Sequence, residues 1–217
     1  MDEANTVDEL RRQLAPAIAD AAAFDGWSGE AVDYAAELAG VDRELARYAF
    51  RDGSMAMIAA WIGHVDDQMI ASTPAASLVG LPVRERIRRL VMARLDAITG
   101  REEALTRALS IMAMPQNLLA ASRLGWRSAD HMWRMAGDTA TDYNHYTKRA
   151  ILAGIYAATL SVFARDDSEG KVETRAFLDR RIDGIIRFEK TKAQIFRAPD
   201  ERFSVTRFLG RLRYPAR

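Results

Sequence analysis

Residues 133–156 read WRMAGDTATDYNHYTKRAILAGIY, a pattern that predicts the end of one helix and the start of another. Gly137 can adopt the left-handed backbone conformation that commonly closes a helix. After it, Thr139, Thr141 or Asp142 can each accept the free N–H groups at the beginning of the next helix. The stretch therefore predicts two helices that meet at a corner.

The helix after this corner begins with four residues of surface type, Asp142, Tyr143, Asn144 and His145. Small and branched residues follow from Ala150. We therefore expect the first turn of this helix to point outward. Helix capping and ordinary solvent exposure explain such residues as well as a protein-binding surface does, and the spacing alone leaves both interpretations open.

Apolar residues recur at helical spacing along the 217-residue chain, and strand-type alternation is hard to find. We therefore predict an all-α fold with a substantial core. The sequence contains no cysteine, which excludes disulfides, zinc–thiolate sites and thiol catalysis. We divide the chain into an amino-terminal module (residues 1–52), a helical ligand-binding and dimerisation core (53–198) and a basic tail (199–217).

Three short helical patterns in residues 7–50 are separated by turns that contain glycine, as in a helix-turn-helix module. The apolar residues expected to face inward from the middle pattern are Ala31, Tyr34, Ala35 and Leu38. Arg43, Arg47 and Arg51 could contact DNA phosphates, but acidic residues surround them and leave the region nearly neutral. We therefore expect no DNA binding.

A strongly amphipathic helix is predicted over residues 83–98. The residues expected on its buried face are Ile87, Leu90, Val91 and Leu95. The residues expected on its solvated face are Arg84, Arg86, Arg88 and Arg94. The simplest interpretation of this helix is one apolar side on the core and one arginine-rich side in water.

Methionine and leucine flank Pro115, with Met112 before it and Leu119 after it. Methionine is flexible and polarizable, so it suits a cavity for a variable apolar ligand, although it more commonly fills irregular gaps in a core. Leu152 and Ile155 lie on one side of the helix predicted over residues 142–164, where they could form a core or a pocket wall. The pattern leaves both possibilities open.

The other side of that helix carries small residues, namely Ala150, Gly154, Ala157 and Ser161. Small side chains allow two helices to approach closely, as at a subunit interface. A second long helix is predicted over residues 172–196. Paired terminal helices of this kind favour a homodimer with two-fold symmetry.

The tail beyond Pro199 is basic, and residues 202–213 form a short amphipathic helical pattern. Its apolar side comprises Val205, Phe208, Leu209 and Leu212, and its polar side comprises Arg202, Arg207, Arg211 and Arg213. Such a pattern is typical of a helix that lies on a membrane surface. A terminal helix that docks on its own core would show the same pattern.

The stretch quoted first resembles the ubiquinone-biosynthesis accessory proteins of the Coq set, specifically its ninth member. Their usual pattern is Ala-Gly-Asp-x-Ser-Thr-Asp-Phe-Asn-Trp-Tyr-Thr-x-Arg, followed by a small-residue helix with Tyr and Thr. The matching residues are Ala136, Gly137, Asp138, Thr141, Asp142, Asn144, Tyr146, Thr147, Arg149, Tyr156 and Thr159. Three positions depart, since Ala140, Tyr143 and His145 stand where the family has Ser, Phe and Trp.

This resemblance implies a lipid-binding protein with a tetracycline-repressor-like helical bundle, an amino-terminal helix-turn-helix and a membrane-seeking carboxy-terminal helix. It assigns lipid binding to Met112, Leu119, Met132, Met135, Leu152, Ile155 and Tyr156. It assigns contact with a partner protein to Asp142, Asn144, His145 and Tyr146. It assigns membrane contact to Val205, Arg207, Phe208, Leu209, Arg211 and Leu212.

The implied task is to bind an isoprenoid quinone precursor, or another lipid, and to present it to the demethoxyubiquinone hydroxylase. A polyprenyl tail is nearly insoluble in water, so a carrier that touches the membrane is physically reasonable. The excess of arginine over lysine and the abundant alanine suggest a bacterial source. The alternative is a transcriptional regulator of the tetracycline-repressor type that senses an apolar ligand.

No nucleophile elbow, phosphate loop or dinucleotide fingerprint occurs in the sequence, and we expect no catalysis, cofactor or metal. Asp142 and His145 lie one helical turn apart, but a di-iron bundle needs further glutamate ligands. The acidic first ten residues do not resemble a targeting peptide, and no apolar run approaches the length of a bilayer span. We therefore expect a cytoplasmic protein that contacts the bacterial inner membrane peripherally.

Overall fold

The computed structural model describes residues 3–139 and 143–196, with side chains over residues 7–139 and 145–184. The described residues form helices and no strand, which confirms the all-α prediction. The α-helices are α1 (Glu3–Asp25), α2 (Gly29–Ala39), α3 (Arg43–Ala49), α4 (Ser54–Ser72), α5 (Val83–Asp96), α6 (Glu102–Met112), α7 (Leu118–Met135), α8 (Tyr143–Phe163) and α9 (Val172–Phe196). Short 3-10 turns lie at Ala75–Leu78, Pro115–Asn117 and Glu169–Lys171.

The chain divides into two compact units, Met1–Asp179 and Arg180–Arg217. Every contact and cavity described below lies within the first unit. The three-part division at residues 52 and 198 stays a prediction, and the tail helix expected over residues 202–213 lies outside the described residues.

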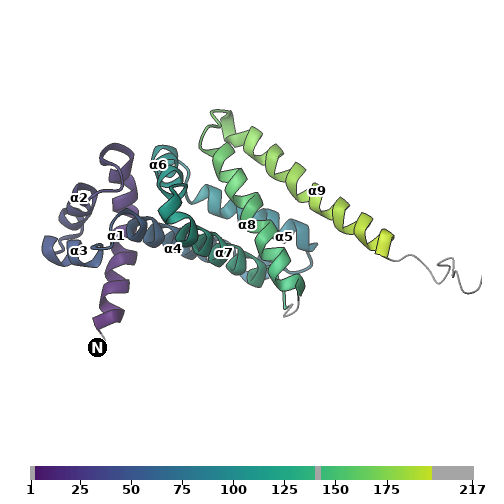
Figure 1. The fold of residues 1–217 in the computed structure, drawn as a ribbon, viewed down its shortest axis with the longest axis horizontal. Helices are drawn as coiled ribbons and strands as arrows, with labels where there is room; N and C mark the ends of the chain where they lie inside the picture. Colours follow the sequence, from purple (N-terminus) through teal and green to yellow (C-terminus); the bar gives the residue numbers. More distant parts are fainter. Residues whose placement is uncertain (1–2, 140–142, 197–217) are drawn as a thin grey trace, which may run out of the picture. The chain divides into compact units, whose positions relative to one another are not determined.

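Helices α1, α2 and α3 form the expected helix-turn-helix (Figure 1). Ser28 begins α2, and its hydroxyl accepts the backbone N–H of Ala31. Gly40 ends this helix at φ 64°, a left-handed conformation that suits glycine. Asp42 begins α3, where its carboxylate accepts the N–H of Leu45 at 2.9 Å. Local capping chemistry therefore fixes both ends of the turn.

The expected burial of α2 is only partly right. Ala31 and Ala35 are fully buried, but Tyr34 and Leu38 are 49% and 64% exposed, so their predicted inward position is wrong. The helix contacts α1 and α3, and its buried side chains are Ala31, Val32, Ala35 and Ala36. Because the buried stripe of α2 is narrow, Tyr34 and Leu38 lie beside it and remain exposed to solvent.

Helix α4 lies at the centre of the first unit, because it contacts α1, α5, α6 and α7. Helices α7 and α8 run side by side, and both α5 and α6 contact them (Figure 1). The corner between α7 and α8 contains Gly137 at φ 87°, as the sequence predicted. This arrangement surrounds a space between α4, α6, α7 and α8.

A buried carboxylate holds the start of α9. Asp166 is 2% exposed and accepts the N–H and hydroxyl groups of Thr174, at 2.7 and 2.6 Å, and the N–H of Ser168, at 3.0 Å. Burial alone would raise the pKa of Asp166, but the hydrogen bonds from Ser168 and Thr174 hold this pKa far below its ordinary value. Asp166 is therefore ionised at neutral pH and caps the helix.

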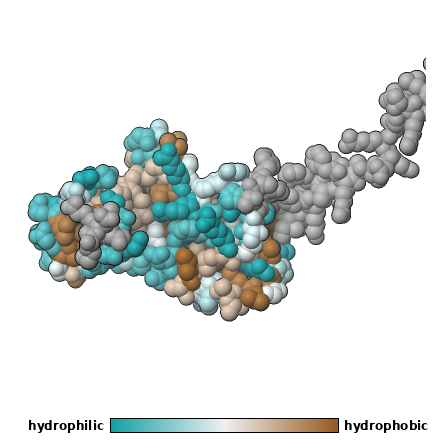
Figure 2. Space-filling view, turned by 90° about the horizontal axis from the view of Figure 1, so that it is seen from below, coloured by the Kyte–Doolittle hydropathy of each residue, from teal (hydrophilic) through white to brown (hydrophobic). Residues whose placement is uncertain are grey.

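Apolar groups also remain on the surface. On the face drawn in Figure 2, hydrophobic surface is broken into separate patches between hydrophilic areas. The most exposed large apolar residues of the described chain include Phe24, Leu38, Val79, Leu119, Tyr146 and Val172. No helix in the described ranges is both long enough and apolar enough to cross a bilayer.

Candidate functional site

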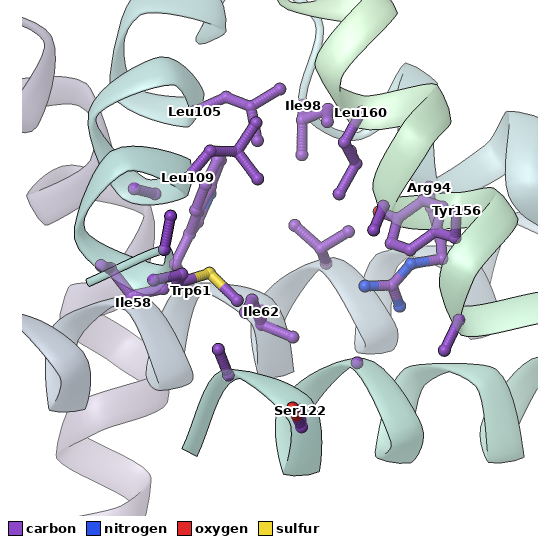
Figure 3. A pocket seen from close by; sticks show the side chains of 18 of the residues that line it. Ile58, Trp61, Ile62, Arg94, Ile98, Leu105, Leu109, Ser122, Tyr156 and Leu160 are labelled. Carbon is purple, nitrogen blue, oxygen red and sulfur yellow. The ribbon is translucent and has the colours of Figure 1, made fainter. Parts of the chain in front are cut away.

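An apolar cavity of about 480 Å³ lies between α4, α6, α7 and α8 (Figure 3). This volume falls in the usual range of small-molecule sites. The larger residues of its wall are Ile58, Trp61, Ile62, Leu105, Leu109, Met112, Trp126, Tyr156 and Leu160. Aromatic and aliphatic side chains therefore cover most of the wall, and the cavity can hold an apolar ligand.

Small residues on α7 and α8 create the space. Ala121 and Gly125 on α7, and Ala153 and Ala157 on α8, all face the cavity. A Cβ atom built on Gly125 would meet no other atom within 4 Å, so the volume beside this residue is open. A chain with leucines at these four positions would fill much of the cavity with its own side chains.

The cavity wall contains one buried cation, Arg94 of α5. This residue was predicted to face solvent, but it is only 1% exposed, so that prediction is wrong. Its Nη1 donates to the carboxylate of Asp66 on α4, which is 2% exposed. The guanidinium carbon also lies 4.9 Å from the ring centre of Tyr156 on α8. The arginine is buried because two other helices supply a counter-ion and an aromatic face.

The surroundings keep Arg94 charged. Burial lowers the pKa of Arg94, but the Tyr156 hydroxyl and the Asp66 carboxylate outweigh this effect and raise the pKa above its ordinary value. The Nε of Arg94 is buried and has no hydrogen-bond partner among the described residues. Figure 3 shows the guanidinium directed into the cavity beside the Tyr156 ring. A charged donor therefore lies in a largely apolar wall.

Asp66 also faces a second hollow on the far side of α4. Its Oδ2 lies 3.6 Å from Nδ1 of His131 and 4.0 Å from Nε of Arg127, and both of those residues line the second hollow. These contacts are longer than the bond to Arg94. One carboxylate therefore holds the cavity cation on one side and weaker basic contacts on the other.

The corner between α7 and α8 carries a network of ion pairs. Arg149 is 1% exposed, and its Nε donates to Asp130 at 2.6 Å while its Nη1 donates to Asp138 at 3.0 Å. Lys148 also donates to Asp138, at 2.7 Å. Burial raises the pKa of Asp138, but the hydrogen bonds from Lys148 and Arg149 outweigh it and hold this pKa below its usual value. These ion pairs join the end of α7 to the start of α8 and stabilise the corner between them.

An aromatic group projects from this corner. Tyr146 is 62% exposed, with its ring 5.1 Å from the ring of His145 and 6.0 Å from the ring of Trp126. Trp126 in turn lines the cavity. The first turn of α8 thus presents an aromatic side chain next to the cavity wall, while the outward position expected of Asp142, Tyr143 and Asn144 falls on side chains outside the described residues.

Comparison with known proteins shows which proteins this chain resembles. Residues 118–189 match the COQ9 family model. The chain is 30% identical over 194 residues to the mitochondrial ubiquinone biosynthesis protein COQ9 of Rattus norvegicus, covering 87% of this chain and 62% of that protein. The corresponding protein of Homo sapiens is 29% identical over 195 residues, covering 87% of this chain and 61% of that protein. The chain is therefore similar to the COQ9 proteins over most of its own length.

The resemblance read from residues 133–156 is thereby confirmed, although the chain spans less than two thirds of the length of these COQ9 relatives. A crystal structure of the TetR transcriptional regulator from Nitrosomonas europaea ATCC 19718 superposes with a TM-score of 0.63. It is 24% identical and covers 81% of this chain and 97% of that chain. At this identity the similarity concerns the fold, and it confirms the predicted tetracycline-repressor-like bundle.

The residues of the COQ9-like pattern have two different surroundings in the structure. Asp138 and Arg149 are parts of the ion-pair network, and Tyr156 lies under the Arg94 guanidinium. Tyr146 is exposed. The pattern therefore includes residues that hold the corner together as well as a residue available to a partner.

The structure brings together only some of the predicted lipid-binding residues. Met112 and Tyr156 line the cavity. Met132, Leu152 and Ile155 are buried in the core without lining it, Met135 is partly buried, and Leu119 is 64% exposed. Of the predicted partner patch, Asp142 and the Asn144 side chain lie outside the described residues.

Sequence reasoning missed the contribution of α4 to this site and, apart from Met112, that of α6. Trp61 and Ile58 recur at core spacing, and nothing in that spacing separates a cavity wall from a filled core. The described residues hold no cluster of three His, Cys, Asp or Glu side chains with the geometry of a metal site. The geometry is that of a binding site for an apolar molecule.

Proposed function

We propose that this protein is a non-catalytic lipid-binding accessory protein of ubiquinone biosynthesis. It binds an isoprenoid quinone precursor, or another lipid, and presents it to the demethoxyubiquinone hydroxylase at the membrane. The observation that carries this proposal is the apolar cavity between α4, α6, α7 and α8. The relatives named as ubiquinone biosynthesis proteins supply the pathway.

The cavity suits a long apolar chain on physical grounds. Burying apolar surface is favourable by about 25 cal/mol per Å² removed from water, and this cavity offers aromatic and aliphatic walls on several sides. Ala113, Ser122 and Ala157 belong to the lining and are exposed, whereas Arg94 and Tyr156 are buried. A ligand could therefore reach from a buried polar end to a more open end.

A cavity-filling variant tests the proposal. Gly125→Leu places a side chain in open space and replaces a helical glycine with a better helix former. Lipid that copurifies with the native protein, measured by mass spectrometry, should be lost from this variant, while the thermal midpoint stays unchanged or rises. Gly63→Leu on α4 is the matched control, because its Cβ also meets no atom within 4 Å but the residue does not line the cavity.

A polyprenylated ring in the native protein would support delivery of a quinone precursor. Retention of the same lipid by Gly125→Leu, at the amount found in Gly63→Leu, would contradict binding in this cavity. An absence of any copurifying lipid, combined with protection of a specific operator, would favour the alternative of a ligand-responsive regulator.

The contacts of the helix-turn-helix support the first function over a regulator. Arg47 donates to Asp33 with both Nε and Nη2, at 2.8 and 2.6 Å, and Arg43 donates to Glu37 at 2.9 Å. Arginines engaged in this way offer little uncompensated charge to phosphates. A mobility-shift assay at low salt should show affinity no better than micromolar, the usual range of non-specific binding.

The exposed turn of α8 is the proposed contact with the hydroxylase. Its described members are His145 and Tyr146, and the patch also includes Asp142 and Asn144. Aromatic residues on a fixed corner suit a protein interface, since they bury a large area at a small entropic cost. The small residues Ala150, Gly154, Ala157 and Ser161 are all exposed, and Ala157 also lines the cavity. We propose that this side of α8 contributes to a homodimer.

A further inference from the structure

Small residues open the cavity at the start of α7. Ala113, which precedes this helix, and Ser122, in its second turn, both line the cavity and are exposed. A ligand that enters or leaves the cavity can pass along this part of the chain. The start of α7 is therefore an open edge of the cavity.

Exposed apolar side chains surround this open edge. Met114 is 42% exposed, Leu118 is 52% exposed and Leu119 is 64% exposed. Leu118 precedes Ser122 by one helical turn, and Leu119 precedes Trp126 by two turns, so each leucine lies on the same side of α7 as a residue of the cavity wall. The two leucines therefore continue the apolar wall onto the surface.

The charge near this edge has one sign. Residues 104–129 contain Arg107, Arg123 and Arg127 and neither aspartate nor glutamate. Arg123 is exposed and forms no ion pair with the part of the chain that the structure describes. The side chain of Arg127 is 46% exposed, and its Nε lies 4.0 Å from the carboxylate of Asp66. An apolar surface flanked by arginines suits the interface of an anionic bilayer.

Other exposed leucines have different surroundings. Leu38 of α2 follows Glu37, and Leu45 of α3 follows Glu44. Their exposed fractions are 64% and 50%, close to those of the two α7 leucines. An anionic bilayer repels a carboxylate beside an exposed leucine, so exposure alone does not make a membrane surface. Leu38 and Leu45 are therefore suitable controls.

We propose that Met114, Leu118, Leu119 and Arg123, here called the mouth surface, contact an anionic lipid bilayer. The inference rests on the proposed function, because the bound lipid passes between the bilayer and the cavity through this contact. The apolar part of the lipid then moves from the acyl chains to the cavity wall without unfavourable exposure to water. The basic tail remains the proposed site of stable attachment, and the mouth surface adds a contact at the cavity itself.

A fluorescent label at position 119 tests this contact. The sequence contains no cysteine, so Leu119→Cys in the full-length protein carries one thiol for the environment-sensitive dye nitrobenzoxadiazole. With vesicles of equal parts phosphatidylcholine and phosphatidylglycerol, the emission should shift to the blue, and nitroxides on the lipid acyl chains should quench it. Vesicles of phosphatidylcholine alone should give a smaller shift, because they do not attract the arginines.

Leu38→Cys with the same dye is the matched control, because Leu38 and Leu119 are both 64% exposed. Its emission should stay unchanged and unquenched. Equal quenching at both positions, or none at position 119, would overturn the proposal. A blue shift at position 119 that needs no vesicles, and grows with protein concentration or on addition of the hydroxylase, would assign the mouth surface to a protein partner and would also overturn it.

The route of the ligand is tested with diphenylhexatriene, a fluorescent hydrocarbon. The loaded protein is mixed with the same vesicles carrying nitroxide lipids, and the loss of fluorescence gives the transfer rate. The native rate should rise with vesicle concentration, as expected of transfer during contact. Leu118→Glu with Leu119→Glu should slow transfer by about tenfold, the effect of about 1.4 kcal/mol on a rate. The thermal midpoint should hardly change, because both side chains are exposed.

Leu38→Glu with Leu45→Glu removes two leucines of similar exposure and adds the same charge, so this variant should transfer at the native rate. Equal rates in the two double variants would overturn the mouth surface while leaving ligand binding intact. Insertion of the dye at position 119 without any bound diphenylhexatriene would support the membrane contact but contradict the proposed function. The two failures are therefore distinguishable.

Discussion

Trp27 lies against Trp61, with the two ring centroids 5.3 Å apart and the ring planes at 41°. The indole N–H of Trp27 also donates to the backbone carbonyl of Ala104 at 3.0 Å. Trp27 follows α1 in the helix-turn-helix, and Trp61 lines the cavity. The amino-terminal module therefore supports the cavity wall directly, which gives it a structural role that does not depend on DNA.

Trp27→Ala should destabilise the protein by about 3–5 kcal/mol, the usual cost of truncating a buried tryptophan. Trp27→Phe should cost less, because it keeps an aromatic face on Trp61 and loses only the bond to Ala104 and some volume. Urea unfolding at 25 °C measures both. Phe24→Ala is the control, since Phe24 is 85% exposed and should change stability by less than about 0.5 kcal/mol. A similar small change in Trp27→Ala would mean that the module does not support the wall.

The Asp166 cap predicts a pH dependence of stability. Its folded-state pKa is depressed, so the cap stabilises the protein fully above the unfolded pKa of about 3.9 and loses its effect as pH falls below that value. Asp166→Asn should cost about 1–3 kcal/mol at pH 7, because it leaves buried donors of Ser168 and Thr174 poorly matched. The difference between the native protein and the variant should shrink in urea titrations below pH 4. A constant difference from pH 7 to pH 3 would rule out the ionised cap.

Tyr146→Ala should weaken copurification with the demethoxyubiquinone hydroxylase by about tenfold or more if Tyr146 is a central contact. The thermal midpoint should hardly change, because the side chain is 62% exposed. Tyr48→Ala on α3 is the matched control, as Tyr48 is also exposed, at 55%. His145→Trp restores the residue of the family pattern and should maintain or strengthen binding. Equal binding by Tyr146→Ala and Tyr48→Ala would place the interface elsewhere.

Deleting residues 202–217 should abolish flotation with anionic liposomes while the remaining chain stays folded and loaded with lipid. Each arginine near an anionic surface contributes about 1 kcal/mol, and partial burial of Phe208, Leu209 and Leu212 contributes a comparable amount. Phe208→Asp should therefore reduce flotation nearly as much as the deletion, and added salt should weaken it. Phe24→Asp in α1 controls for the charge change. Undiminished flotation of the truncated chain would show that the tail docks on the protein.

Local chemistry was sufficient to predict the helix ends. Gly137 has the left-handed conformation expected of it, and Ser28, Gly40 and Asp42 occupy capping or left-handed positions that suit their residue types, because such preferences depend on a few neighbouring atoms. The family pattern in residues 136–159 likewise led to the tetracycline-repressor-like fold, which the structural comparison confirms. These features are encoded within short stretches of the chain.

The cavity could not be predicted in the same way. A helical projection places Arg94 among solvated arginines, and only the arrival of Asp66 from α4 and Tyr156 from α8 explains its burial. Apolar spacing also cannot distinguish Leu152, which is buried in the core, from Leu160, which faces the cavity. Both distinctions depend on how distant helices meet, and the sequence of one helix does not contain that information.

Trp126 lines the cavity and also lies 6.0 Å from the exposed ring of Tyr146. A lipid in the cavity and a hydroxylase on Tyr146 would therefore be separated by little more than one indole ring. Because binding free energies are reciprocal, a lipid that strengthened hydroxylase binding through Trp126 would itself be held more tightly by the complex. Such coupling would favour capture of the lipid before docking, and its release would then require the enzyme to consume the bound molecule or the two proteins to separate.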